Sequence, residues 1–230
     1  MAYYPQVIAV GAGEGAAGSI THTIGGTSGI SRSGDLILIF LESANQAFTP
    51  VVGYSTAPSS PQGFGAAAAI GAVRLTTFYK FSNGTETTYV TGDSGNHNFV
   101  ASMVIRGVDR AIPFNAGVGN TATAATTITC PSVTTTVPEC LIINAVATDY
   151  DVNSTAVFAS ATNANLTNIT ERIDGSTTQQ NGGGLGVFTG LKGTAGSTGS
   201  TTVTYTTPIS EESANITLAL APLRRRVMYA

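Results

Sequence analysis

The chain has little charge. Only 10% of its 230 residues are Asp, Glu, Lys or Arg, and the formal net charge is −3, whereas an average soluble protein has roughly 25% charged residues. Proteins that bind nucleic acid through its phosphates need a basic field, so this composition excludes broad electrostatic binding to nucleic acid. A free monomer with so few charges has poor solubility. We therefore expect a partner to cover part of the surface.

Side chains that often carry chemistry are also scarce: there is no tryptophan, and there are two histidines and two cysteines. Neither His22 nor His97 has a neighbour of metal-ligand type at helical or strand spacing, so we expect both to be solvated loop histidines. Two cysteines without paired histidines match no zinc spacing. We expect Cys130 and Cys140 to be small buried side chains, with a disulfide as the alternative. The sequence thus predicts no metal and no cofactor.

Long apolar runs are absent as well. The most apolar stretch, Leu36–Leu41, has six residues and is too short to span a membrane, so we expect no membrane partner. The first residues, 1–6, contain no basic region and no long apolar region, so they do not form a secretory signal peptide. The sequence predicts synthesis in the cytoplasm without a signal peptide.

What the chain does have is a strand signal at Leu36–Leu41, which is rich in branched side chains. Leu36, Leu38 and Phe40 face one side of such a strand, while the apolar residues between them face the other. A strand with one solvated face should alternate apolar and polar residues. We therefore predict that this strand is covered on both faces, by the N-terminal segment folded back or by a neighbouring subunit. A weaker copy lies at 140–147, where Asn144 interrupts the second face.

The order of strands around the first run recurs around the second. The matched segments are 36–41 with 141–147, 75–78 with 185–188, 87–91 with 202–206, and 101–105 with 216–220. Short strands, turn signals and dense Thr and Val, with no helix of ordinary length, predict an all-β fold. We expect an antiparallel, jelly-roll-like β-sandwich of about eight main strands in two pseudo-repeated halves. The alternative is that any sandwich with even strand spacing resembles itself in this way.

This pattern divides the chain into three parts. Residues 1–32 form an N-terminal strand and a glycine-rich segment, and residues 33–222 form the sandwich, with pseudo-repeated halves at 33–110 and 137–222. Residues 120–127 are polar and low in complexity, which predicts a linker between the halves. Residues 223–230 form an Arg-rich C-terminal tail.

Gly13, Gly15 and Gly18 match the spacing of a dinucleotide-binding fingerprint and come after a short strand. That motif needs a helix next, because the pyrophosphate sits on the helix N-terminus. Here the next run is rich in Gly, Ser and Thr, and such a run does not hold a helix. We interpret the segment as a glycine-rich loop or edge strand.

Asp149 and Asp151 come directly after the second apolar run. Such a pair suits a glycosidase or a calcium site, but acids after a strand also serve as turn formers, which is our interpretation. The sequence contains no Gly-x-Ser-x-Gly elbow for a nucleophilic serine. We find no aromatic platform for a sugar either. The sequence therefore predicts no catalytic residues and no enzyme.

The tail is the one marked charge feature, because Arg224, Arg225 and Arg226 are three of the ten basic residues. Arginine makes bidentate pairs with carboxylates, and Met228 and Tyr229 add apolar contact area. We predict that these five residues bind a partner, with a solvated chain end as the alternative.

Three stretches of the first half carry a family resemblance: 34–39, 74–80 after a Pro-rich loop, and 101–109. Together they resemble β-sandwich domains of phage virion and prophage proteins, and the second half is similar at 170–172 and 218–222. The resemblance covers most of residues 33–222. It implies a non-enzymatic virion protein, namely a capsid decoration (cement) protein that stabilises the particle by packing on the major capsid protein. It also implies self-association as a dimer or trimer, with a tail-fibre or receptor- or glycan-binding module as the alternative function.

Overall fold

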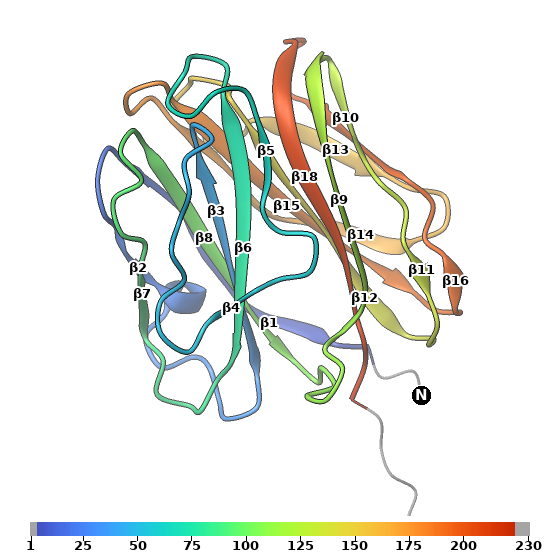
Figure 1. Ribbon diagram of the computed structural model, residues 1–230. Coiled ribbons are helices and arrows are strands. Elements are labelled where there is room, and N and C mark those ends of the chain that lie inside the picture. Colours follow the sequence, from blue (N-terminus) through green and yellow to red (C-terminus); the bar gives the residue numbers. More distant parts are fainter. Residues whose placement is uncertain (1–3, 224–230) are drawn as a thin grey trace, which may run out of the picture.

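The structure is a computed structural model that describes residues 4–223 (Figure 1). It consists of antiparallel β-sheets packed in layers, which confirms the predicted all-β sandwich. The described residues contain a single short helix, the 3-10 turn η1 (Ile24–Gly26). None of them forms a helix long and apolar enough to cross a membrane.

Two main sheets form the middle of the molecule. In the first sheet the strand order is β1 (Gln6–Ala16), β8 (Asn98–Arg106), β3 (Leu36–Ser43), β6 (Val73–Phe81) and β4 (Ser55–Thr56), with β5 (Gln62–Phe64) also on β6. In the second sheet the order is β14 (Thr167–Thr177), β15 (Gly183–Lys192), β12 (Cys140–Thr148), β18 (Glu211–Leu220) and β9 (Phe114–Ala125).

Three small sheets accompany the main ones. They are β2 (Thr21–Thr23) with β7 (Thr88–Val90); β10 (Thr127–Cys130), β17 (Thr201–Tyr205) and β13 (Phe158–Thr162); and β11 (Thr134–Thr135) with β16 (Gly196–Ser197). Each main sheet is therefore built from one half of the chain, and each half adds small strands outside its own main sheet.

The two halves share one pairing scheme, and the eight strands matched in the sequence all occur. β3 lies between β6 and β8, as β12 lies between β15 and β18. β1 is the edge strand next to β8, and β9 is the edge strand next to β18. Outside the main sheets, β2 pairs with β7 as β10 pairs with β17. β4 lies on β6 as β14 lies on β15, and the schemes differ in β13, which joins β17 and has no counterpart on β7. Shared pairing of this kind is a stronger sign of a structural repeat than strand spacing alone.

The central core lies between the main sheets. Leu36, Leu38 and Phe40 of β3 point into it and belong to the same apolar cluster as Leu141 and Ile143 of β12. Both strands are buried along their whole length, because a strand in the middle of a covered sheet buries both faces.

The outer face of β3 is covered as predicted. Ile37, Ile39 and Leu41 are fully buried against Ile20 and Ile24 from the N-terminal segment, together with Tyr89 and other residues of the same chain. The cover is thus internal and needs no neighbouring subunit. In the second half Asn144 is also buried, and it accepts a hydrogen bond from Thr217 Oγ1 at 3.0 Å. The polar interruption therefore does not open that face to solvent.

The predicted linker at 120–127 is wrong. Residues up to Ala125 belong to β9, an outer strand of the second main sheet that pairs with β18, and β10 starts at Thr127. Thr and Ala residues in this stretch alternate well enough to hold an edge strand, although their composition resembles a linker.

The glycine-rich segment is an edge strand, which confirms that interpretation and explains two of its three fingerprint glycines. A Cβ at Gly13 would lie 2.3 Å from the Phe99 ring, and one at Gly15 would lie 2.4 Å from Thr177 Cβ. β1 thus lies too close to Phe99 of β8 at Gly13, and to Thr177 of β14 at Gly15, for side chains at these positions. In the second half, Gly117 meets Pro58 in the same manner. A Cβ at Gly18 would meet nothing within 4 Å, so close packing explains two of the three fingerprint glycines, and only Gly15 packs against the second half.

Candidate functional site

The candidate site is a hollow at one end of the sandwich, where loops of both halves meet. We call it the acidic hollow, and it is lined by Ile70, Gly71, Asp149, Tyr150, Asp151, Gln180, Asn181, Glu211 and Glu212. Both ends of the described chain lie at the opposite end of the sandwich. Gln6, at the start of β1, pairs with Arg106, and the Leu223 N–H donates to Gly107 O at 2.7 Å. The hollow lies at the last residue of β12 and the first residues of β18, and the ends of the described chain lie at the other end of these strands (Figure 1).

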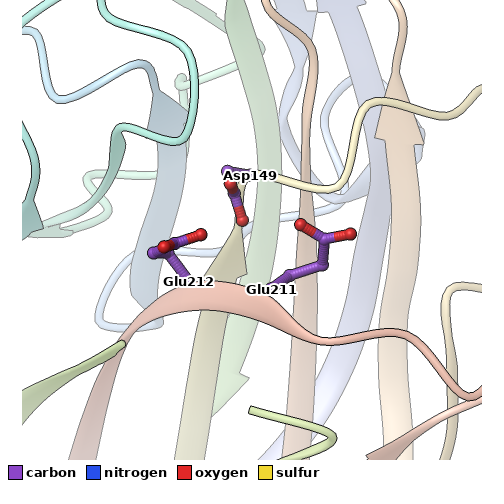
Figure 2. Close-up of side chains that lie close together, drawn as sticks. All are labelled: Asp149, Glu211 and Glu212. Carbon is purple, nitrogen blue, oxygen red and sulfur yellow. The ribbon is translucent and has the colours of Figure 1, made fainter. Parts of the chain in front are cut away.

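Strand pairing brings three carboxylates together in the hollow. Asp149 comes directly after the last residue of β12, and Glu211 and Glu212 begin the antiparallel neighbour β18. One oxygen from each carboxylate lies within 4.8 Å of the others, and Figure 2 shows Asp149 between the two glutamates. The group sits on the rigid ends of two central strands.

The three carboxylates repel one another. Burial, followed by the charge of Glu211 and contact with Glu212, raises the pKa of Asp149 to about 7. Burial and Glu212 also raise the pKa of Glu211. Within residues 4–223 no ion pair joins a lysine or arginine to any of the three. Asp149 Oδ1 is itself buried and has no hydrogen-bond partner among those residues. No lysine or arginine of the described residues neutralises this cluster, and the Asp149 carboxyl is in hydrogen-bond contact with Glu211 and Glu212.

From the sequence, turn formation is the expected role of Asp149 and Asp151, with a glycosidase pair or a calcium site as the alternative. Asp149 and Asp151 do lie at the same hollow, but Asp149 clusters with Glu211 and Glu212 instead. Asp151 packs on the turn at Gly182, where a Cβ would lie 2.2 Å from Asp151 Oδ1. The missed glutamates are distant in sequence. No sequence pattern placed the strand ending at 220 beside the strand starting at 140, and this pairing is seen only in the structure. Carboxylate oxygens at this spacing suit a hard metal cation or a guanidinium.

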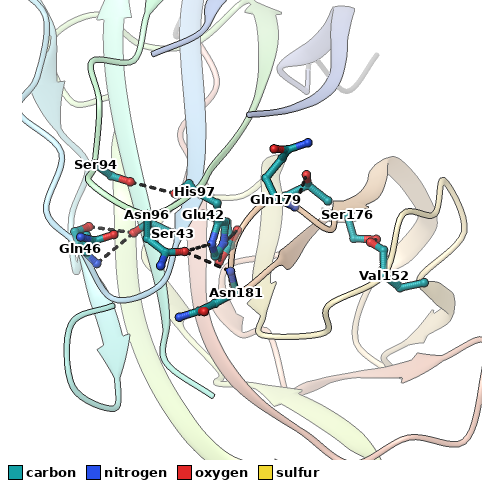
Figure 3. Close-up of polar contacts among 11 residues, drawn as sticks. Glu42, Ser43, Gln46, Ser94, Asn96, His97, Val152, Ser176, Gln179 and Asn181 are labelled. Atoms are coloured by element: carbon teal, nitrogen blue, oxygen red, sulfur yellow. Dashed lines mark hydrogen bonds and ion pairs between the residues drawn. The ribbon is translucent and has the colours of Figure 1, made fainter. Parts of the chain in front are cut away.

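His97 is not a solvated loop histidine, so that expectation is wrong. Its side chain and that of Glu42 are fully buried, and His97 Nε2 lies 2.9 Å from Glu42 Oε2 (Figure 3). Burial raises the pKa of Glu42 to about 7, although its contact with His97 works against that rise. Asn96 Oδ1 contacts His97 Nδ1 at 3.0 Å and accepts the Asn181 N–H at 3.2 Å, which ties this pair to a loop of the second half. The pair is buried because loops distant in sequence close over it.

His22 is also buried, contrary to expectation. Its Nε2 lies 2.9 Å from Ser102 Oγ and its Nδ1 lies 3.1 Å from Glu14 Oε1. Burial lowers the pKa of His22, which favours the neutral ring. This Ser–His–Glu order resembles a hydrolase relay, but Ser102 and His22 are fully buried, and Ser102 Oγ already accepts the Gly25 N–H at 2.9 Å. The relay fastens the N-terminal segment to β8 and leaves no room for a substrate.

The remaining predicted residues divide into two groups. Cys130 and Cys140 are both free and buried, which confirms the first interpretation over the disulfide. Burial raises the pKa of Cys130 to about 12 and that of Cys140 to about 11, so neither thiol is activated. The predicted partner-binding residues Arg224, Arg225, Arg226, Met228 and Tyr229 lie outside the described residues.

Comparison with known proteins adds no relative to this picture: no protein-family model, no curated protein and no solved structure matches the chain.

Proposed function

We propose that the chain is a non-enzymatic structural protein of a bacteriophage virion, where it decorates the capsid and stabilises it by packing on the major capsid protein. The observation that carries this proposal is the polarity of the molecule. Gln6 and Leu223 flank Gly107 and its neighbour Arg106 at one end, and the loops of both halves meet at the other. A rigid module of this shape suits attachment to a lattice at one pole and contact with a neighbour at the other.

The use of side chains also supports a structural role. The four apolar clusters fill both faces of both main sheets. Most ion pairs among residues 4–223 fasten parts of the fold together, as Asp35 does with Arg106 and Glu42 with His97. The residues most like a catalytic relay, around Ser102, are sealed inside the fold. A chain that commits its polar groups to packing suits a particle component better than an enzyme.

The test is particle composition and stability. Mass spectrometry of gradient-purified particles from the phage or prophage that encodes the chain should find it in many copies per particle. Particles assembled without it should release their DNA at a lower temperature, and adding purified chain should restore the wild-type release temperature. Absence of the chain from purified particles would refute the proposal.

A receptor- or glycan-binding module on a tail fibre is the second candidate. A polar hollow between β1 and β14 favours it, lined by glycines and by Asn153, Asp174 and Gln179 among others. Hydroxyl, amide and carboxylate groups of this kind bind sugar hydroxyls. A glycan array should then show a ligand that is lost in the variant Asn153→Ala/Gln179→Ala, since both side chains are exposed and their loss leaves the core intact. A capsid decoration protein should bind nothing on the array.

A further inference from the structure

We propose that the acidic hollow is a docking site for a second copy of this chain, whose arginine segment, Arg224–Arg226, binds Asp149, Glu211 and Glu212. The contact joins copies head to tail, with the hollow of one molecule facing the opposite pole of the next. The inference does not depend on a virion role, because it concerns only how the chain associates with itself.

Charge complementarity is the first argument. The sequence has 13 acidic and 10 basic residues in 230. Four of the acids line this hollow, and three of the basic residues are consecutive at 224–226. These two concentrations of opposite charge stand out in a chain with little charge elsewhere. Complementary patches of this kind set the register and orientation of an interface.

The second argument is that the hollow is incomplete within one copy. Asp149 Oδ1 is buried and has no donor among residues 4–223, and no lysine or arginine of that region pairs with the three carboxylates. A buried acceptor without a partner costs about 1–3 kcal/mol, more when it is charged. A guanidinium carries five N–H donors in a planar fork, so one arginine satisfies several carboxylate oxygens at once.

The rim of the hollow suits the apolar residues at the end of the tail. Ile70 stands at the edge with 92% of its surface exposed, beside Tyr150. Gly71 lines the hollow with φ +76°, a backbone conformation that other residues rarely adopt. Met228 and Tyr229 lie a few residues after the arginine segment and can cover the exposed Ile70.

The segment must come from another molecule. β18 has ten residues between Glu211 at the hollow and Leu220 near the other pole, and a strand rises about 3.3 Å per residue, so roughly 30 Å separates them. Arg226 is three residues beyond Leu223, and an extended chain advances at most ~3.6 Å per residue, or roughly 11 Å. A heterologous contact of this kind closes into a ring or grows into a filament.

Sedimentation velocity of the full chain tests the proposal with two variants. The tail variant is Arg224→Ser/Arg225→Ser/Arg226→Ser, and the hollow variant is Glu211→Gln/Glu212→Gln. We expect the wild type to grow in mass with concentration in low salt and to dissociate in 0.5 M NaCl. Each variant alone should stay monomeric. An equimolar mixture should form a one-to-one dimer and nothing larger, because it contains one intact hollow and one intact arginine segment.

The matched control is Asp93→Asn/Glu171→Gln, which removes two acids outside the hollow and should associate like the wild type. Circular dichroism checks that every variant is folded. If the hollow variant is unfolded, Ile70→Ser replaces it, and we expect at least threefold weaker association. The proposal is wrong if the wild type is monomeric throughout, if the mixture gives no dimer, or if the control loses association. It is also wrong if calcium binds the hollow of the tail variant while the mixture stays monomeric, because the hollow is then a metal site.

Discussion

The two halves of the molecule share one pairing scheme but treat their carboxylates in opposite ways. In the first half Glu42, near the end of β3, is buried against His97. In the second half Asp149, just after the end of the matched strand β12, faces two further carboxylates and no cation of the described chain. The strands determine where these acids lie, and the loops determine whether they are paired. The paired acid serves the fold, whereas the unpaired group lies at the surface where we propose that a second copy docks.

In contrast to the carboxylates, the apolar clusters on the outer faces of the two main sheets are alike. Phe78 on β6 and Phe188 on the matched β15 are both about 1% exposed, and each contacts an aromatic ring from a strand outside its sheet. We expect Phe78→Ala and Phe188→Ala each to lower the free energy of unfolding by about 3–5 kcal/mol, the usual cost of truncating a buried aromatic. Urea denaturation measures both. A large difference between the two losses would show that the halves are not equivalent in stability.

The second prediction concerns the buried carboxylate of Glu42 after its partner His97 is removed. His97→Ala leaves Glu42 buried without its partner, and removing one member of a buried pair costs about 3 kcal/mol. The pKa of Glu42 is about 7 with His97 in place, and His97 acts to lower it, so without His97 the pKa is higher still. The orphaned carboxyl is therefore protonated at little cost at pH 5, whereas at pH 8 either losing or keeping its proton in the buried site is unfavourable. The loss should therefore be larger at pH 8. Ser94→Ala on the same turn is the control and should cost less than 1 kcal/mol; equal losses for His97→Ala at the two pH values would contradict the pairing.

The third prediction concerns the unpaired carboxylates, where we expect a substitution to raise the free energy of unfolding instead of lowering it. The pKa of Asp149 is raised to about 7 in the folded state, so its favourable contribution is complete below about pH 4 and is lost as pH rises through 7. Asp149→Asn removes this loss. In 0.5 M NaCl, where association is screened, it should raise the free energy of unfolding by about 1 kcal/mol at pH 8, by less at pH 5, and not at all below about pH 4. Asp93→Asn should change none of these values, and destabilisation by Asp149→Asn at pH 8 would overturn this interpretation.

The smallest expected effect is at a partly buried ion pair. Lys80 Nζ lies 2.7 Å from Glu86 Oε1. Hydrogen bonds to Lys80 and Ser82 outweigh burial and lower the pKa of Glu86 to about 2. Lys80→Met should cost about 0.5–1 kcal/mol at pH 7. The cost should shrink as pH falls from about 4.5 toward 2, because protonated Glu86 no longer needs the lysine. A cost that does not vary with pH would mean that Lys80 acts through packing alone.

Sequence patterns predicted the architecture better than the site. The apolar run Leu36–Leu41 and its copy at 140–147 identified the central strands, because burial on both faces leaves an unbroken apolar pattern. The histidines were misassigned, because burial of His22 and His97 depends on loops that close from distant positions. Asp149 was recognised as a candidate. Its partners Glu211 and Glu212 were not, because their proximity depends on the register between β12 and β18.

The most direct test of the central claim, that Asp149 belongs to a site completed by a second copy, is a carboxyl titration by NMR. The tail variant would be titrated with and without a peptide of sequence 224–230. We predict that Asp149 titrates near pH 7 in the variant alone, and that saturating peptide lowers its pKa by a unit or more, because a guanidinium then faces the carboxylate. A peptide with serines in place of the arginines should have no effect. An Asp149 pKa that is the same with and without the arginine peptide would contradict the account.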